Sequence, residues 1–173
     1  MKVFKSALLV LVAVTFNSAA LAGTPDGLQI ISLASEKAEP YASTINAYFD
    51  RYDHDATASH CENARLNVGG VYVKKGTKGI NYDMALAAAV SKKKRQQLGA
   101  LMTKFRDKNH DRGFDAALVY DVKDGSLVLH GVSADIDTKV VSSVLPFSDL
   151  KNTAKVNAAI CRALVNIPVL AEP

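Results

Sequence analysis

Apolar and polar residues follow two spacings along this chain, and each spacing predicts one kind of element. Apolar residues three and four apart lie on one face of a helix. This spacing predicts a helix from Ser148 to Ile167, capped by Ser148, and another that opens at Pro40. The 81–108 stretch is one long helix or two helices that meet at Ser91, which would cap the second. Two helical faces are predicted to be core: Tyr41, Ile45, Tyr48, Phe49 and Tyr52 in one, and Val156, Ala159, Ile160, Ala163, Leu164 and Ile167 in the other.

Runs rich in β-branched and aromatic residues predict a hairpin over 116–132. Asp124-Gly125 lies between the two runs and accepts the positive φ angles of a two-residue turn. The register that this turn sets puts Asp121 and His130 together on one side of the hairpin, as diagonal neighbours. The opposite side is predicted to be core, through Leu118, Tyr120, Leu127 and Leu129.

Three other stretches leave a choice between structures. Residues 66–74 predict a strand, with a bulge or a close backbone approach at Gly69-Gly70. Residues 28–33 form a short strand, or belong to a helix that Thr24 caps. Residues 135–144 form either a strand or a helix.

Together these elements predict an α+β fold. We expect a small antiparallel sheet, which includes the 116–132 hairpin, with three or more helices packed on one face. No internal repeat or linker interrupts residues 23–173, so we expect one domain there.

The first 22 residues have the composition of a cleaved signal peptide. Lys2 and Lys5 precede an uncharged apolar run at 7–16 that is too short to span a bilayer. Ala20-Leu21-Ala22 then fits a cleavage site, with Gly23 as the next residue. We therefore expect an exported protein, periplasmic or secreted, with no transmembrane segment after cleavage.

The charge balance is close to neutral once the signal is removed. The whole chain has 21 basic and 17 acidic residues, and the signal takes two lysines away, which leaves 19 against 17. This small excess does not favour binding to nucleic acid, and no aromatic residues lie among the lysines 92–94.

Two cysteines in an exported chain predict one disulfide, between Cys61 and Cys161. The bridge would close a loop of about 100 residues, for which chain entropy gives an upper figure of about 4.7 kcal/mol. It would also attach the last helix to the polar segment 53–63. The alternative is two buried thiols.

The polar segment before Cys61 is the densest group of ligand-type residues. Asp53, His54, Asp55 and His60 are side chains that bind zinc or exchange protons. Their spacing matches no metal-site motif, so we expect neither a metal nor a cofactor. A solvated loop is the preferred interpretation, and His54, Asp55 and His60 are one of two candidate surfaces for a partner.

The run Lys92-Lys93-Lys94-Arg95 is a second candidate contact surface, for phosphates, an anionic envelope surface or an acidic protein. It is also typical of a solvated helix face. No nucleophile motif accompanies Asp121 and His130, which favours a cross-strand surface pair over a catalytic pair.

These observations favour a binding protein over an enzyme. We expect a small exported protein that acts on a macromolecular partner, of the inhibitor, immunity or envelope-accessory type, through the 53–60 loop or Lys93 and Lys94. The alternative is a small secreted hydrolase or metal-dependent enzyme that uses the histidines and aspartates of that loop.

Overall fold

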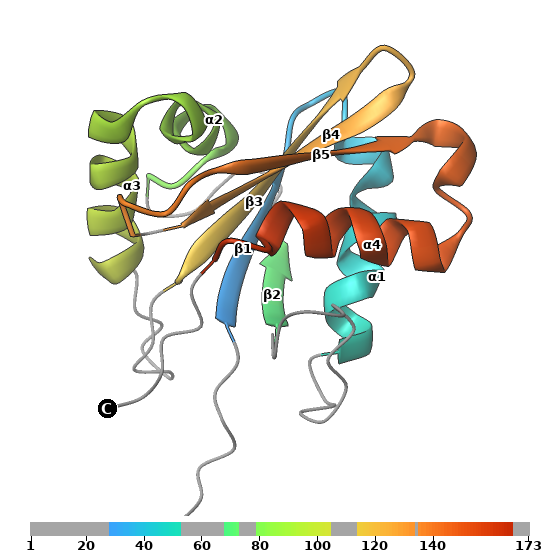
Figure 1. The fold of residues 1–173 in the computed structure, drawn as a ribbon, viewed down its shortest axis with the longest axis horizontal. Helices are drawn as coiled ribbons and strands as arrows, with labels where there is room; N and C mark the ends of the chain where they lie inside the picture. The colour runs from blue at the N-terminus through green and yellow to red at the C-terminus, as the bar shows by residue number, and fades with distance from the viewer. Residues whose placement is uncertain (1–27, 53–67, 73–78, 105–113, 134, 168–173) are drawn as a thin grey trace, which may run out of the picture.

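The computed structural model describes residues 28–52, 68–72, 79–104, 114–133 and 135–167 (Figure 1). In this part of the chain the strands form one five-stranded sheet, and helices lie beside it. In chain order the elements are β1 (Leu28–Ala34), η1 (Glu39–Tyr41), α1 (Ala42–Tyr52), β2 (Val68–Tyr72), α2 (Tyr82–Val90), α3 (Lys92–Lys104), β3 (Ala116–Lys123), β4 (Ser126–Ser133), β5 (Val141–Pro146), η2 (Phe147–Asp149) and α4 (Thr153–Leu164).

The sheet is mixed, and the expectation of an antiparallel sheet was wrong. Its strand order is β2-β1-β3-β4-β5, with β1 parallel to both of its neighbours and β4 antiparallel to β3 and β5. The physical reason lies in the connections. The chain passes through α1 between β1 and β2, and through α2 and α3 between β2 and β3. Such helical crossovers return the chain to the end at which the first strand began, so the two strands run parallel.

Helices cover both faces of the sheet, whereas the sequence predicted one covered face. In Figure 1, α1 and α4 lie on one side of the sheet, and α2 and α3 lie on the other. The first core joins the sheet to α1 and α4 through side chains such as Ile45, Tyr120 and Ile160. The second core joins the sheet to α2 and α3 through side chains such as Ile31, Leu98 and Val119. The interior strand β1 is therefore buried on both faces, as parallel strands generally are.

The hairpin prediction is confirmed. Tyr120 lies opposite Leu129, and Leu118 opposite Gly131, in the register that a two-residue turn requires. Asp124 and Gly125 both have positive φ, at 46° and 72°. The four side chains predicted to be core are all fully buried: Leu118, Tyr120, Leu127 and Leu129. The Ser32 hydroxyl donates to Tyr120 Oη across 3.4 Å, which provides the buried phenol with a polar partner.

The last helix begins later than predicted. Ser148 belongs to η2, and α4 starts after Asn152, whose side-chain oxygen accepts a hydrogen bond from Lys155 N at 3.2 Å. Asn152 is therefore the N-cap, because its oxygen satisfies an amide of the first turn. The predicted apolar face is confirmed and packs in the first core: Val156, Ala159, Ile160, Ala163, Leu164 and Ile167.

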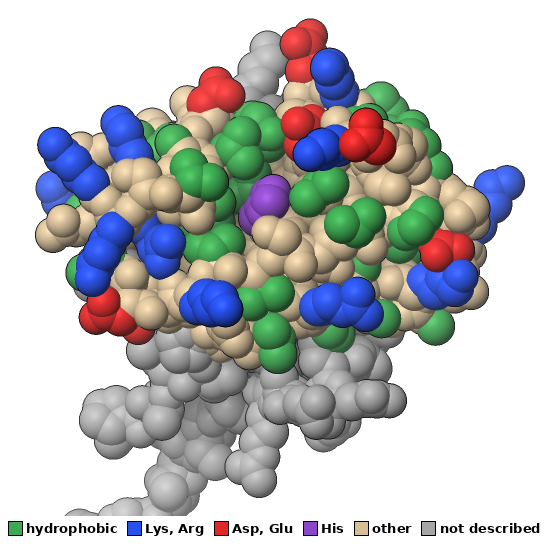
Figure 2. Space-filling model, turned by 45° about the horizontal axis from the view of Figure 1, so that its top comes forward, with side chains coloured by type: hydrophobic (Ala, Val, Ile, Leu, Met, Phe, Trp, Pro, Cys, Tyr) green, Lys and Arg blue, Asp and Glu red, His purple; other side chains and the backbone are tan. Residues whose placement is uncertain are grey.

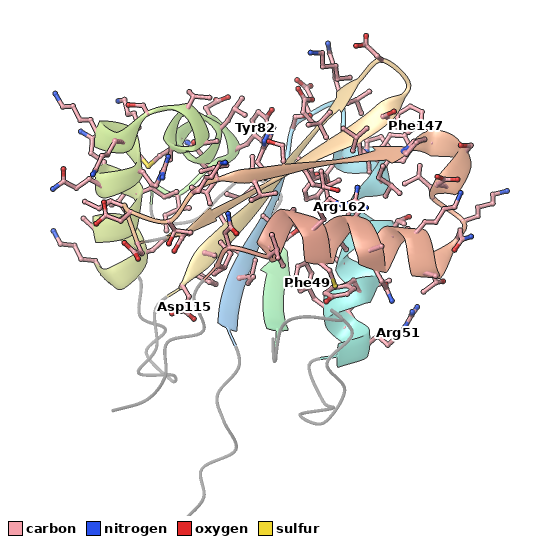
Figure 3. The ribbon with its side chains drawn as sticks, in the orientation of Figure 1. Phe49, Arg51, Tyr82, Asp115, Phe147 and Arg162 are labelled. Carbon is pink, nitrogen blue, oxygen red and sulfur yellow. The ribbon has the colours of Figure 1, made fainter. Side chains whose placement is uncertain are left out.

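The remaining open choices are also settled. Residues 28–34 form a strand, and residues 141–146 form the edge strand β5. The pairing of β2 runs through Gly69 and Gly70 without a bulge. Two helices meet at Ser91, and the Ser91 hydroxyl accepts from Lys94 N at 3.4 Å, as expected for a cap. In α1, Ile45, Tyr48 and Phe49 are buried, and Figure 3 shows Phe49 beneath α4, so this part of the aromatic stripe is core.

The backbone of α4 approaches the sheet closely at Gly131. A Cβ atom on Gly131 would lie 2.1 Å from the carbonyl oxygen of Ala163 and 2.9 Å from its carbonyl carbon. Both atoms belong to the main chain, so no side-chain rotation relieves the overlap. Only a residue without a Cβ lets the last turn of α4 pack on β4 in this way.

We expect Gly131→Ala to lower the free energy of unfolding by about 1–3 kcal/mol or more, since overpacking a core usually costs this much. Urea denaturation followed by circular dichroism measures this loss. Ser148→Ala, at an exposed position, is the matched control and should change stability by less than about 0.5 kcal/mol. Equal stabilities for the two variants would contradict the close approach of α4.

Candidate functional site

Among the described residues, helices cover one part of a sheet face less fully than the rest of it. On the face that α2 and α3 cover, the residues packed under the helices are fully buried, up to Val132 on β4, whereas those nearer the β3–β4 turn and on β5 are not. We call this second group the open sheet surface, and it consists of Asp121, Val128, His130, Ser142 and Val144. The register places them on one face, with Val128 opposite Asp121 and Val144, and His130 opposite Ser142. Figure 2 shows the histidine in purple on this surface, with hydrophobic side chains around it. Val144 is 55% exposed.

Asp121 lies where the order of the strands reverses. The chain leaves β1 toward β2 on one face of the sheet and returns to β3 over the other face, so the connections diverge between β1 and β3. In sheets of this kind, ligands bind outside the carboxyl ends of the strands at this point. Ser35 directly follows β1 and donates its hydroxyl to Asp121 Oδ1 at 2.5 Å. The amide of Val122 also donates to Oδ1, at 2.7 Å.

Hydrogen bonds keep the Asp121 carboxylate ionised. Partial burial opposes ionisation, but donors from Ser35, Val122 and Tyr82 outweigh it and hold the pKa of Asp121 below its ordinary value. Tyr82 comes from the first turn of α2, which Figure 3 shows beside the sheet. Burial, followed by the charge of Asp121, raises the pKa of Tyr82 to about 12, so this phenol stays protonated and donates.

His130 forms a separate pair with Ser142 on the neighbouring strand. His130 Nδ1 lies 2.7 Å from Ser142 Oγ. Burial lowers the pKa of His130, and the negative charge of Asp121 opposes that shift. The imidazole is therefore neutral at physiological pH, and the open sheet surface has an uncharged centre. The diagonal placement of Asp121 and His130 is as predicted, but the partner Ser142 was missed because residues 135–144 had no assigned structure.

The four bases of the run 92–95 differ in what they contact. Lys92 Nζ lies 3.0 Å from Asp137 Oδ1, and both side chains are exposed. Arg95 is half-buried and donates to the carbonyl oxygens of Ala88, Ile136 and Thr138, so it attaches the α2–α3 junction to the loop before β5. These two residues have structural contacts that the sequence did not predict.

Lys93 and Lys94, the two lysines that the sequence proposed for partner binding, are exposed on the first turn of α3. The other predicted contact residues, His54, Asp55 and His60, lie outside the described residues.

Cys161 lies on α4, partly buried against the first core, with its Sγ 3.6 Å from Tyr48 Oη of α1. Its predicted partner Cys61 lies outside the described residues, so the disulfide stays a prediction.

No three side chains of the metal-binding kinds gather within the described ranges, and no helix there has the length and apolar character needed to cross a membrane. Comparisons of the chain with protein-family models, curated proteins and solved structures find no match.

The predicted disulfide can be tested by counting thiols. We expect the denatured, unreduced protein to react with no maleimide–polyethylene glycol, and the reduced protein to react at two sites, which gel mobility separates. Cys61→Ser is the control and should show one reactive thiol without reductant. Two reactive thiols in the unreduced wild-type protein would contradict the bridge.

Burial of His130 makes stability depend on pH. Because its pKa in the folded protein lies below the ordinary 6.5, the unfolded chain binds a proton first as the pH falls. The stability that neutral His130 contributes is complete above pH 6.5 and is lost as the pH falls through the folded pKa. We expect His130→Gln to lose less unfolding free energy than the wild type between about pH 7.5 and about pH 5.

Chemical denaturation at the two pH values measures this difference. Ser142→Ala, which keeps the histidine, is the control and should still lose stability on acidification. Asp121 does not account for a loss of stability between these two pH values. Its pKa lies below the ordinary value of 3.8, so its stabilising effect is lost only at a lower pH than this range. An equal loss in the wild type and in His130→Gln would show that His130 is not responsible.

Proposed function

We propose that this protein is an exported binding protein that takes up an extended segment of a partner protein along β5 and the open sheet surface. The proposal includes the cleavage of residues 1–22, a single domain over 23–173 and the Cys61–Cys161 bridge. The observation that carries it is the composition of β5 at the edge of the sheet.

β5 lacks the features with which proteins usually protect a sheet edge. Exposed edge strands normally carry lysines, other charges, bulges or internal prolines, because an unpaired edge invites another strand to bind. Residues 141–146 read Val-Ser-Ser-Val-Leu-Pro and contain no charged side chain. The pairing with β4 continues without a bulge from Val141 to Pro146, and the only proline is the last residue. β5 has a strand neighbour on one side only in the described part of the sheet.

The side chains of β5 differ between its two faces. Leu145 packs in the first core, and Ser143 is buried beside it. Ser142 and Val144 point to the other face and belong to the open sheet surface. A strand added beside β5 would gain backbone hydrogen bonds, and its side chains on this face would contact Val144 and the uncharged His130–Ser142 pair.

The hydrogen bonds on this surface favour binding over catalysis. The Asp121 carboxylate accepts from Ser35, Val122 N and Tyr82, whereas His130 pairs with Ser142. The carboxylate that a catalytic histidine needs as its orienting partner is thus used to join β1, β3 and α2. The alternative function, a hydrolase, depends on residues of the 53–60 loop, which lie outside the described residues.

A charge at Val144 tests the proposal. Chains that begin at Gly23 would serve as bait in an envelope extract, and a captured protein would be identified, purified and titrated by calorimetry. We expect Val144→Lys to weaken its affinity at least about tenfold, because a lysine on an edge strand opposes strand addition. Val165→Lys is the matched control and should leave affinity unchanged, since Val165 is 50% exposed on a different surface.

Hydrogen exchange identifies the surface that the partner covers. We expect slower exchange of the amides of 141–145 in the complex with the purified partner. A partner that binds Val144→Lys as well as wild type, or that protects other amides, would overturn the proposal. Protection of 141–145 that depends only on the concentration of this protein would assign β5 to a second copy of the chain.

A further inference from the structure

The junction of α2 and α3 presents an exposed apolar side chain. α2 is built almost entirely of apolar residues, yet only Ala85 and Ala88 on it are buried. Val90, its last residue, is 86% exposed, the highest value for a large hydrophobic residue in the described part of the chain. The chain turns at Ser91, which has extended backbone angles, so Val90 lies at the end of one helix and immediately before the next. Neither core uses this side chain.

Two lysines accompany Val90 at the same junction. Successive residues of a helix are about 100° apart, so Lys92 and Arg95 share one side of α3 and Lys93 and Lys94 point elsewhere. Lys92 is paired with Asp137, and Arg95 binds backbone carbonyl groups. The charges of Lys93 and Lys94 therefore face solvent, and Figure 2 shows basic side chains gathered on the α2–α3 side of the molecule.

Helix stability does not explain these lysines. The first turn of α3 contains no acidic residue. The positive end of the helix dipole lies at this turn and disfavours cations. Lys93 and Lys94 thus occupy positions at which Asp or Glu would stabilise the helix. An external anionic partner would gain from this charge.

We propose that Val90, Lys93 and Lys94 form a docking surface for an anionic phospholipid bilayer, and we call it the basic junction. Val90 enters the boundary between headgroups and acyl chains, and the two lysines contact lipid phosphates. This proposal is independent of the partner on β5. An exported protein with this surface would bind its partner while held reversibly at the membrane.

The size of the basic junction favours a bilayer over a protein. A stable protein interface covers about 800 Å² on each partner and needs a well-packed apolar centre. One valine and two lysines are too few side chains for such a centre. Reversible attachment to a membrane needs no such centre, because shallow apolar insertion and each lysine near the anionic surface add to the affinity separately.

Vesicle sedimentation tests the basic junction. The chain from Gly23 would be mixed with vesicles of phosphatidylglycerol and phosphatidylcholine, or of phosphatidylcholine alone, at low salt. We expect binding to the anionic vesicles only, weakening as salt is added. Each unit of charge near such a surface is worth about fivefold in partitioning, so the Lys93→Glu/Lys94→Glu double variant should bind at least about a hundredfold more weakly.

Matched variants separate the basic junction from net charge and from general apolarity. Lys123→Glu/Lys151→Glu changes the net charge by the same amount at two other exposed lysines and should bind as wild type. Val90→Asp should weaken binding, and Val165→Asp should not. Circular dichroism confirms that each variant is folded.

Three results would overturn the proposal. The first is no difference between the two vesicle types, and the second is equal loss of binding in the two double variants. The third is binding to soluble polyglutamate without binding to anionic vesicles, which would assign the basic junction to an acidic protein. None of these results affects the partner on β5, because Val144 lies outside the basic junction.

Discussion

The structure depends on the burial of β1 between two parallel neighbours. Residues 30–34 run Ile-Ile-Ser-Leu-Ala, and every one of these side chains is buried, including the polar Ser32. A strand with apolar side chains on both faces needs a helical layer on each side. The crossover connections supply these layers, since α1 follows β1 and the α2–α3 pair precedes β3. The two cores, the parallel pairing and the strand order all follow from this one requirement.

The same arrangement leaves part of one sheet face, the one opposite α4, less covered by helices. α2 and α3 cover part of this face, where Ile31 on β1, Val119 on β3 and Val132 on β4 are buried. Toward the β3–β4 turn and on β5 the same face carries the open sheet surface, while α4 covers the other face of β4 and β5, where Gly131 admits its backbone. The open sheet surface is therefore a consequence of adding an antiparallel hairpin and an edge strand to a parallel core.

The sequence predicted the elements whose pattern is local. The Asp124-Gly125 turn sets the hairpin register on its own, and the spacing from Val156 to Ile167 sets the buried face of α4. The parallel pairing depends on combining distant elements, and the local pattern left residues 28–33 open between a strand and a helix. Helix caps were less certain, because Ser148 and Asn152 are both suitable caps and only the position of η2 decides between them.

The candidate site was less predictable than the fold. The pairing of His130 with Ser142 requires the register between β4 and β5, which no turn of fixed length specifies. Lys92 and Arg95 contact the 135–138 loop, whereas Lys93 and Lys94 face solvent. This difference follows only once the position of that loop is known. Such contacts between distant segments are absent from any local pattern of residues.

Two surfaces of this protein depart from what its own folding would favour. An uncharged edge strand promotes unwanted pairing, and cations in the first turn of a helix oppose its dipole. Elsewhere the chain follows local rules closely, with a suitable turn at Asp124-Gly125, caps at Ser91 and Asn152 and a glycine where two backbones meet. Departures of this kind are expected where a sequence is constrained by an interaction instead of by stability. Because β5 and the basic junction belong to different elements, each can be altered without changing the other.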